Sequence, residues 1–152
     1  MVILAARPSM GKTAMALNIA QMVAKKKNVA IFSLEMSKEQ LTDRMVCAAM
    51  GIDSWKLQKG ELSDEEFARI GDALSELSQA RMFIDDSASM NLLEIKSKCR
   101  RLKMESGLDL IVIDYLQLIN GTNPNNRVQE ISDISPGLKS LARELSVPTI
   151  AL

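Results

Sequence analysis

The 152-residue sequence contains no histidine, and only 3% of its residues are aromatic. Without histidine there is no imidazole base, nucleophile or metal ligand, so histidine-dependent catalysis and histidine metal sites are excluded. Such a small number of Trp, Tyr and Phe side chains also makes stacking platforms for nucleic-acid bases scarce.

The chain also lacks net charge, because 19 basic and 19 acidic residues cancel. It has no global basic field, so contact with DNA would have to be local or built by oligomerisation. No apolar run approaches the length of a membrane span, and the start of the chain lacks the basic region of a signal peptide. Cys47 and Cys99 have no paired spacing and are interpreted as reduced core residues. We therefore expect one cytoplasmic domain without membrane association.

Short apolar runs alternate with segments of helical spacing along the chain. Strands are predicted over residues 2–5, 28–33, 82–85, 108–114 and 147–152, with helices between them, one of them over residues 38–50. Capping boxes are expected where Ser37, Ser63 and Asn91 open three of these helices. This alternation predicts an α/β fold, in which a mainly parallel sheet carries helices on both faces.

Two of the predicted helices carry specific expectations. The helix opened by Ser63 has four apolar residues at helical spacing that should be buried as one stripe: Phe67, Ile70, Leu74 and Leu77. In the segment 131–145, Pro136 interrupts the helical pattern, and a proline ring clashes with the preceding turn. Because Pro136 fits better as the first residue of a new helix capped by Ser135, we predict a break or kink there.

The most specific stretch is Ala-Arg-Pro-Ser-Met-Gly-Lys-Thr at residues 6–13, between the first strand and the first helix. Gly11 allows the backbone to approach a phosphate, and the first amides of the following helix point at it. Lys12 supplies a cation for the β and γ oxygens, and the Thr13 hydroxyl can ligate Mg²⁺. The phosphate-loop pattern expects glycine where this chain has Ala6, so Ala6 must keep a negative φ.

Two acidic residues follow later strands and should reach the same edge of the sheet as this loop. Glu35 lies just past the strand 28–33, and Asp114 ends the apolar strand 108–114. Glu35 can orient and deprotonate a water that attacks a γ-phosphate, although an ordinary exposed loop position explains it equally well. Asp114 can hold Mg²⁺, usually through water, beside Thr13.

Other charged residues have simpler explanations. Arg44 falls near the middle of a predicted helix, which is usually a solvated position, and Asp85-Asp86 is expected in a solvated turn. Five cations of one helix could contact phosphate or another subunit, but a solvated helix face is the commoner explanation: Lys96, Lys98, Arg100, Arg101 and Lys103.

With these residues assembled, the sequence resembles the ATPase domain of DnaB-type replicative helicases, a RecA-like motor. The matching stretches are residues 6–13, 32–37, 98–103, 112–119 and 141–145, and the resemblance spans essentially the whole chain. Alanine is ordinary in this family at the position of Ala6. The resemblance implies a RecA-like P-loop NTPase core, of which residues 1–152 would be a part without its C-terminal portion, because the family continues with further strands, a second DNA-binding loop and an arginine finger. Pro136-Gly137 departs from the family pattern.

The resemblance also implies a role for individual residues. Glu35 and Lys12 would be catalytic, and Thr13 and Asp114 would bind Mg²⁺. The nucleotide would be held by Ser9, Met10, Gly11, Lys12, Thr13, Ala14 and Arg44. The loop 121–127 would face a central channel, with Asn126 and Arg127 touching single-stranded DNA.

The function implied is that of an ATP-dependent replicative DNA helicase subunit, which uses ATP and Mg²⁺ to move along single-stranded DNA and unwind the duplex. Implied partners are single-stranded DNA, further copies in a homo-oligomeric, hexameric ring, a primase and a helicase loader. Two alternatives stay open: a RecA-like recombinase-type ATPase, and a fragment that binds nucleotide without turnover. A P-loop small-molecule kinase is less favoured, because the sequence has no lid or acceptor-site signature.

Overall fold

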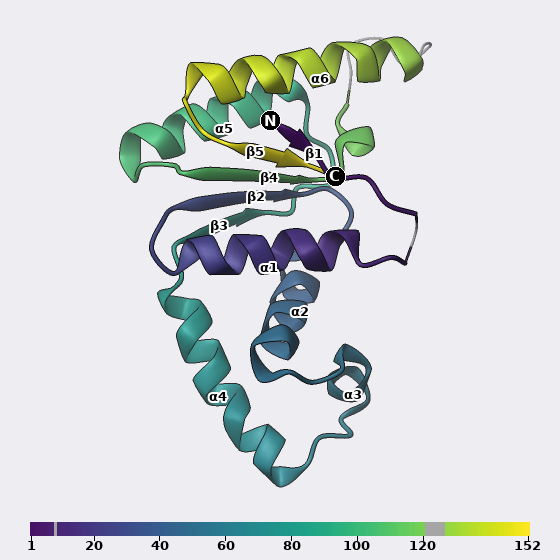
Figure 1. The fold of residues 1–152 in the computed structure, drawn as a ribbon, viewed down its shortest axis with the longest axis vertical. Helices are drawn as coiled ribbons and strands as arrows, with labels where there is room; N and C mark the ends of the chain where they lie inside the picture. Colours follow the sequence, from purple (N-terminus) through teal and green to yellow (C-terminus); the bar gives the residue numbers. More distant parts are fainter. Residues whose placement is uncertain (8, 121–126) are drawn as a thin grey trace.

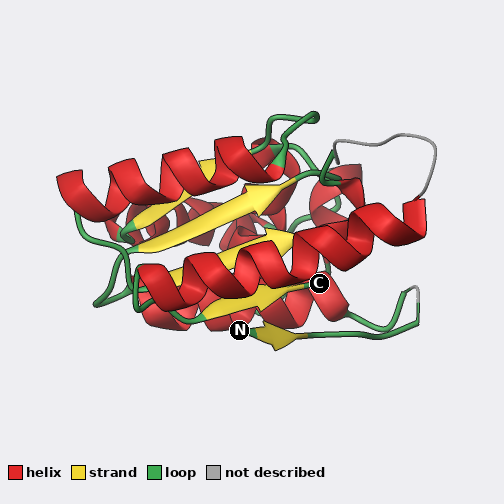
Figure 2. Ribbon diagram, turned by 90° about the horizontal axis from the view of Figure 1, so that it is seen from above, coloured by secondary structure: helices red, strands yellow, loops and turns green. Residues whose placement is uncertain are grey.

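The computed structural model describes residues 1–7, 9–120 and 127–152. Its sheet has five strands: β1 (Val2–Ile3), β2 (Val29–Ser33), β3 (Met82–Asp85), β4 (Leu110–Asp114) and β5 (Thr149–Ala151). The strand order is β1-β5-β4-β2-β3, and every neighbouring pair is parallel. All strands therefore point toward the same edge (Figure 2). The predicted parallel α/β fold is confirmed.

Helices cover both faces of this sheet (Figure 1). They are α1 (Lys12–Ala24), α2 (Lys38–Met50), α3 (Ser54–Lys59), α4 (Asp64–Gln79), α5 (Leu92–Glu105), the 3-10 helix η1 (Leu116–Leu118) and α6 (Arg127–Glu144). Helices α5 and α6 lie on one face, and α1 lies on the other, where α2, α3 and α4 extend away from the sheet (Figure 1). No helix in the described part of the chain is long and apolar enough to cross a membrane.

The core has two layers because alternate residues of each central strand face opposite sides of the sheet. Ile111 and Ile113 of β4 pack with buried residues of α5 and α6, whereas Val112 packs with buried residues of α1 and α2. Cys47 and Cys99 are buried and free, and burial raises the pKa of the Cys99 thiol to about 12. Both cysteines are therefore core residues, as predicted.

Helix α6 runs from Arg127 to Glu144 with Pro136 inside it, so a helix break is wrong, and the alternative of a kink stays a prediction. An internal proline costs about 3 kcal/mol. Packing offsets this cost, because Ile134, Leu138 and Leu141 on the same helix are at most 2% exposed. Gly137 contributes to the same contact: a Cβ there would lie 2.3 Å from Cδ2 of Leu92, so the glycine lets α6 approach α5 closely.

The predicted stripe on α4 is only partly buried. Ile70 and Leu77 pack against α2, but Phe67 is 69% exposed and Leu74 is 46% exposed. Helix α4 packs mainly on α2 and extends away from the sheet, so only a narrow stripe of its surface is covered (Figure 1). The capping boxes predicted at Ser37, Ser63 and Asn91 are all present, which explains why these helix starts were predictable.

Candidate nucleotide-binding site

A pocket of about 680 Å³ lies at the edge of the sheet to which the strands point. The loop between β1 and α1, with the first turn of that helix, contributes Ala6, Arg7, Ser9, Gly11, Lys12, Thr13 and Ala14. Glu35 and Met36 follow β2, Gln40 and Arg44 belong to α2, and Tyr115 follows β4. Segments far apart in sequence thus meet because all the strands are parallel.

The loop before α1 has the backbone of an anion-binding site. Gly11 is the N-cap of α1 with φ 81°, and no side chain caps this helix in the described part of the chain. Ser9 has φ 64°, while Ala6 avoids positive φ, as predicted. The first amides of α1 are therefore left for a ligand at the positive end of the helix dipole. A Cβ added at Gly11 would meet no atom within 4 Å, so the backbone angle rather than crowding demands glycine.

Thr13, which lines the pocket, contacts Asp114, which lies behind it and does not line the pocket. The Thr13 hydroxyl donates a hydrogen bond of 2.8 Å to Oδ2 of Asp114, a residue that is only 2% exposed. The other carboxylate oxygen, Oδ1, is buried without a hydrogen-bond partner in the described part of the chain. An unpaired buried carboxylate oxygen is costly, so this atom suits a cation.

These two residues fit Mg²⁺. The described residues contain no group of three or more His, Cys, Asp or Glu side chains that could form an all-protein metal cage. Mg²⁺ does not need one, because it usually keeps several waters and binds one or two carboxylates together with substrate phosphates. The hydroxyl of Thr13 and the carboxylate of Asp114 are oxygen donors of this kind.

Lys12 has a partner that the sequence analysis missed. Its Nζ lies 5.1 Å from the centre of the Tyr115 ring, within cation–π range. The backbone next to this ring is fixed, because the amide of Leu116 donates a 2.9 Å hydrogen bond to the carbonyl of Leu152. The sequence did contain a signal for this contact. Because Tyr115 directly follows Asp114, it had to lie at the same edge of the sheet as the phosphate loop.

Glu35 lines the pocket with an exposed side chain. Its segment is attached to β4, because the Leu34 amide donates a 2.7 Å hydrogen bond to the carbonyl of Asp114. Arg44 also lines the pocket, although its side chain is exposed as expected for a mid-helix position. The structure thus brings Glu35 and Arg44 to the phosphate loop.

Four predicted residues are not among those that line this pocket in the described structure. One of them, Asp114, is connected to the pocket through its hydrogen bond with Thr13. Met10 is 73% exposed and is not among the lining residues. Asn126 lies outside the described residues, as does the side chain of Arg127.

The basic residues of α5 are largely engaged within the chain. Lys98 forms an ion pair with Asp85, Arg100 donates two hydrogen bonds to Glu144 at 2.6 and 3.0 Å, and Lys103 donates to a backbone carbonyl. The hydrogen bonds from Arg100 lower the pKa of Glu144. These contacts support the simpler interpretation of this face over a phosphate contact.

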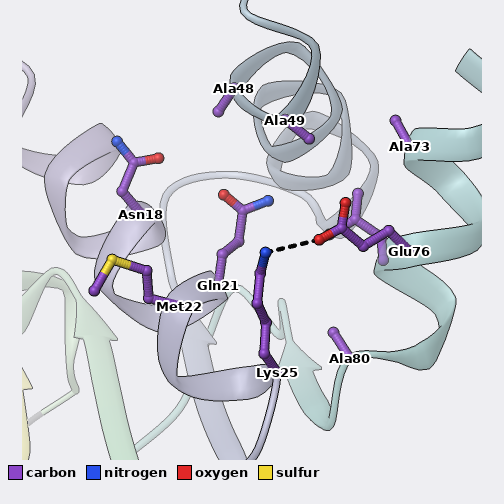
Figure 3. Close-up of a pocket in the computed structure, with 10 residues that line it drawn as sticks. Asn18, Gln21, Met22, Lys25, Ala48, Ala49, Ala73, Glu76 and Ala80 are labelled. Carbon is purple, nitrogen blue, oxygen red and sulfur yellow. Dashed lines mark ion pairs between the residues drawn. The ribbon is translucent and has the colours of Figure 1, made fainter. Parts of the chain in front are cut away.

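A second pocket, of about 420 Å³, lies between α1, α2 and α4 (Figure 3). Lys25 and Glu76 form an ion pair of 2.8 Å across it, with side chains 61% and 59% exposed. Exposed pairs of this kind contribute little free energy. Much of the remaining lining is small and apolar: Ala48, Ala49, Ala73 and Ala80. This pocket lacks the free helix amides and the unpaired buried carboxylate oxygen of the first.

Comparison with known families agrees with this geometry. The family model of the DnaB-like helicase C-terminal domain matches residues 1–152. The chain belongs to this family. This confirms the resemblance inferred from the sequence.

Curated relatives of the DnaB-like family match the whole chain. The chain is 56% identical to the replicative DNA helicase DnaB of Geobacillus stearothermophilus and 54% identical to the replicative DNA helicase DnaC of Bacillus subtilis (strain 168), each over 156 aligned residues. It covers 34% of the length of each of these two proteins. The chain thus corresponds to about a third of such a helicase.

Solved structures share the fold closely. A DnaB-like replicative helicase, studied with its interactions with primase, aligns with a TM-score of 0.93 at 37% identity, over 100% of this chain and 38% of that one. A separately solved ATPase domain aligns with a TM-score of 0.92 at 38% identity, over 99% of this chain and 55% of that one. The RadB recombinase, at 22% identity and a TM-score of 0.52, shares the fold alone; the alignment covers 99% of this chain and 59% of that one.

Proposed function

We propose that residues 1–152 form part of the RecA-like ATPase domain of a replicative DNA helicase subunit, in which ATP hydrolysis drives translocation on single-stranded DNA and duplex unwinding. The observation that carries this proposal is the contact between Thr13 and Asp114, which leaves one buried carboxylate oxygen unpaired directly beside the phosphate loop. A loop of this kind beside a buried acid is the arrangement that P-loop NTPases use for a nucleotide with its Mg²⁺.

ATP would bind with its phosphates against the loop that ends at Gly11. The free amides at the start of α1, together with Ser9 and Ala14, line the pocket and would surround the phosphates, and Lys12 would place its charge near the β and γ oxygens. Arg44 adds a second cation from α2. These positive groups favour a polyanion over a neutral ligand.

Glu35 would serve as the general base. Its carboxylate lines the same pocket as Lys12, so it can accept the proton of a water that attacks the γ-phosphorus while the bond to the bridging oxygen breaks. Thr13 and Asp114 would hold Mg²⁺, which when bound neutralises charge developing on the phosphate oxygens. Lys12 stabilises the same charge electrostatically.

The wider assembly is proposed from family membership. Single-stranded DNA, a hexameric ring of identical subunits, a primase and a helicase loader would be the partners, and the site of action would be the cytoplasm. One solved relative was studied with its interactions with primase, which supports a primase contact in this protein. In such a ring, residues from a neighbouring subunit can complete each hydrolytic site.

ATP hydrolysis should be measured on the longest native polypeptide that contains residues 1–152, with and without single-stranded DNA, beside Glu35→Gln. We expect turnover that DNA stimulates and a fall of at least about 100-fold in the variant, because a general base contributes that much or more. Turnover that DNA does not affect would contradict the helicase proposal and favour another RecA-like ATPase. Nucleotide binding without hydrolysis would show that the polypeptide binds nucleotide but lacks residues needed for turnover. If the folded protein neither binds nor hydrolyses nucleotide, the P-loop assignment is contradicted.

A further inference from the structure

The turn that carries Glu35 is closed by a buried hydroxyl. Ser33, the last residue of β2, is 1% exposed, although the other four residues of that strand are apolar. Its Oγ donates a hydrogen bond of 2.6 Å to the carbonyl of Met36 and accepts one of 3.3 Å from the amide of the same residue. These two bonds form a small ring that encloses the backbone of Glu35, so one side chain fixes both ends of the turn.

The chain beyond this turn is held by a residue of a different strand. Asp86, which directly follows β3, accepts a 2.9 Å hydrogen bond at Oδ2 from the amide of Lys38, the first residue of α2. The carboxylate also lies at the positive end of the α2 dipole. On the other side of Glu35, the Leu34 amide is bonded to the carbonyl of Asp114. The segment from β2 to α2 is thus tied to both neighbouring strands.

We propose that Ser33 is a positioning residue for Glu35, and that Asp86 supports it by fixing the start of α2. The inference rests on the proposed function, since it concerns the geometry of the proposed general base. Ser33 is 1% exposed and does not line the pocket, so it would act through Glu35 rather than on the nucleotide directly. It sets where the Glu35 carboxylate points, and a base displaced by a fraction of a bond length transfers a proton less often.

The arrangement separates turnover from nucleotide binding. The phosphate loop follows β1, while Ser33 ends β2, and two strands, β5 and β4, lie between them in the sheet. Loosening the Glu35 turn should therefore leave the phosphate contacts intact. The expected signature of Ser33→Ala is a lower kcat at unchanged nucleotide affinity.

The test is a double-mutant cycle of Ser33→Ala and Glu35→Gln in the longest native polypeptide that contains residues 1–152. We expect Ser33→Ala to lower kcat about tenfold, with the Kd of a non-hydrolysable ATP analogue changed less than about twofold. In the Glu35→Gln background, Ser33→Ala should have no further effect, because a residue that acts through Glu35 has nothing left to position. Asp86→Asn should act in the same direction by a smaller factor, because an amide oxygen can still accept the Lys38 hydrogen bond.

Thr149→Val is the matched control. Thr149 is also a buried hydroxyl residue at 1% exposure, but it lies at the start of β5, away from the edge that carries the pocket. The Thr149→Val substitution should lower the melting temperature of the protein without changing kcat. Amide hydrogen exchange provides a readout independent of turnover: Ser33→Ala should speed exchange at residues 34–38, whereas Thr149→Val should not.

Each outcome has one meaning. An unchanged kcat in folded Ser33→Ala, or an equal loss in both backgrounds of the cycle, would overturn the positioning role while leaving the proposed function standing. Wild-type protein without turnover, or full turnover in Glu35→Gln, would overturn the proposed function and the inference with it. If Ser33→Ala does not fold, Asp86→Asn in the same cycle decides the question.

Discussion

The two halves of the candidate site rest on very different parts of the sheet. The phosphate loop follows β1, an edge strand of two residues, Val2 and Ile3, which are 62% and 59% exposed and pair only with β5 in the described part of the chain. The Glu35 turn follows β2, whose five residues are all buried and which pairs with β3 on one side and β4 on the other. Within residues 1–152, the phosphate loop thus follows a strand with one neighbouring strand, and the Glu35 turn follows a strand with two.

The hydrogen bonds within each segment indicate which half depends on a ligand. The Glu35 turn is closed by the chain's own bonds, through Ser33 and Asp86. The phosphate loop has a long internal bond of 3.3 Å, from the amide of Met10 to the carbonyl of Arg7, and leaves the first amides of α1 uncapped. Nucleotide should therefore stabilise the β1 half much more than the β2 half, since it provides the partners that the loop lacks.

Lys12→Ala should have the largest effect on the β1 half. Removing a cation that contacts phosphate costs a charge-assisted hydrogen bond, so we expect nucleotide affinity to fall by about 10- to 100-fold. Isothermal titration with ADP and a non-hydrolysable ATP analogue measures this directly. Lys26→Ala, beyond the far end of α1, is the control and should bind as the wild type does. Wild-type affinity in Lys12→Ala would remove the basis for the phosphate site.

Gly11→Ala tests whether the phosphate loop is held only weakly in its binding conformation. At φ 81° an added Cβ is strained by about 1 kcal/mol or more, although nothing lies within 4 Å of it. Because the described residues of the loop make only the 3.3 Å bond between Met10 and Arg7 within it, we expect the loop to relax in the free protein and to recover the strained form only on binding. Nucleotide affinity, measured by the same titration, should then fall about fivefold to tenfold, with little change in the free energy of unfolding.

Gly71→Ala is the matched control for this backbone effect. Gly71 lies inside α4, has no positive φ, and also has nothing within 4 Å of an added Cβ. The substitution should raise the free energy of unfolding by about 0.5–1 kcal/mol and leave affinity unchanged. If Gly11→Ala instead lowers stability and spares affinity, the phosphate loop is as rigid as the Glu35 turn, and the contrast between the halves is wrong.

The sequence predicted much of this candidate site because several of its residues had a local signal, whereas Arg44 was expected there only from the family resemblance. The Gly-Lys-Thr run, the acid that ends an apolar strand and the capping box at Ser37 all depend on residues within a few positions of one another. Helix α2 was therefore predicted with its observed bounds, Lys38–Met50. The expectation of a parallel sheet then predicted that these segments meet at the carboxyl ends of the strands.

What the sequence could not predict depends on contacts between distant segments. No local pattern indicates that Asp86 would bond the start of α2, or that Tyr115 would face Lys12. The exposure of Phe67 was missed because periodicity predicts an apolar stripe but not whether another element covers it. The continuity of α6 at Pro136 was missed for the opposite reason, because packing outweighed a local rule.

The smallest expected effect joins the two halves through Tyr115, which is anchored on β4 and faces Lys12 on the β1 side. If the ring holds the lysine by its π face, then Tyr115→Phe and Tyr115→Trp should keep nucleotide affinity, whereas Tyr115→Leu should lose about twofold to fivefold. Leucine is apolar and fills much of the same space, so a ring that serves only as packing would tolerate it about as well as phenylalanine. The affinities should therefore rank with the strength of the π face rather than with side-chain volume. If the affinities of these variants rank with side-chain volume instead, the Tyr115 ring does not hold Lys12 through its π face. The phosphate loop would then be stabilised by nucleotide alone.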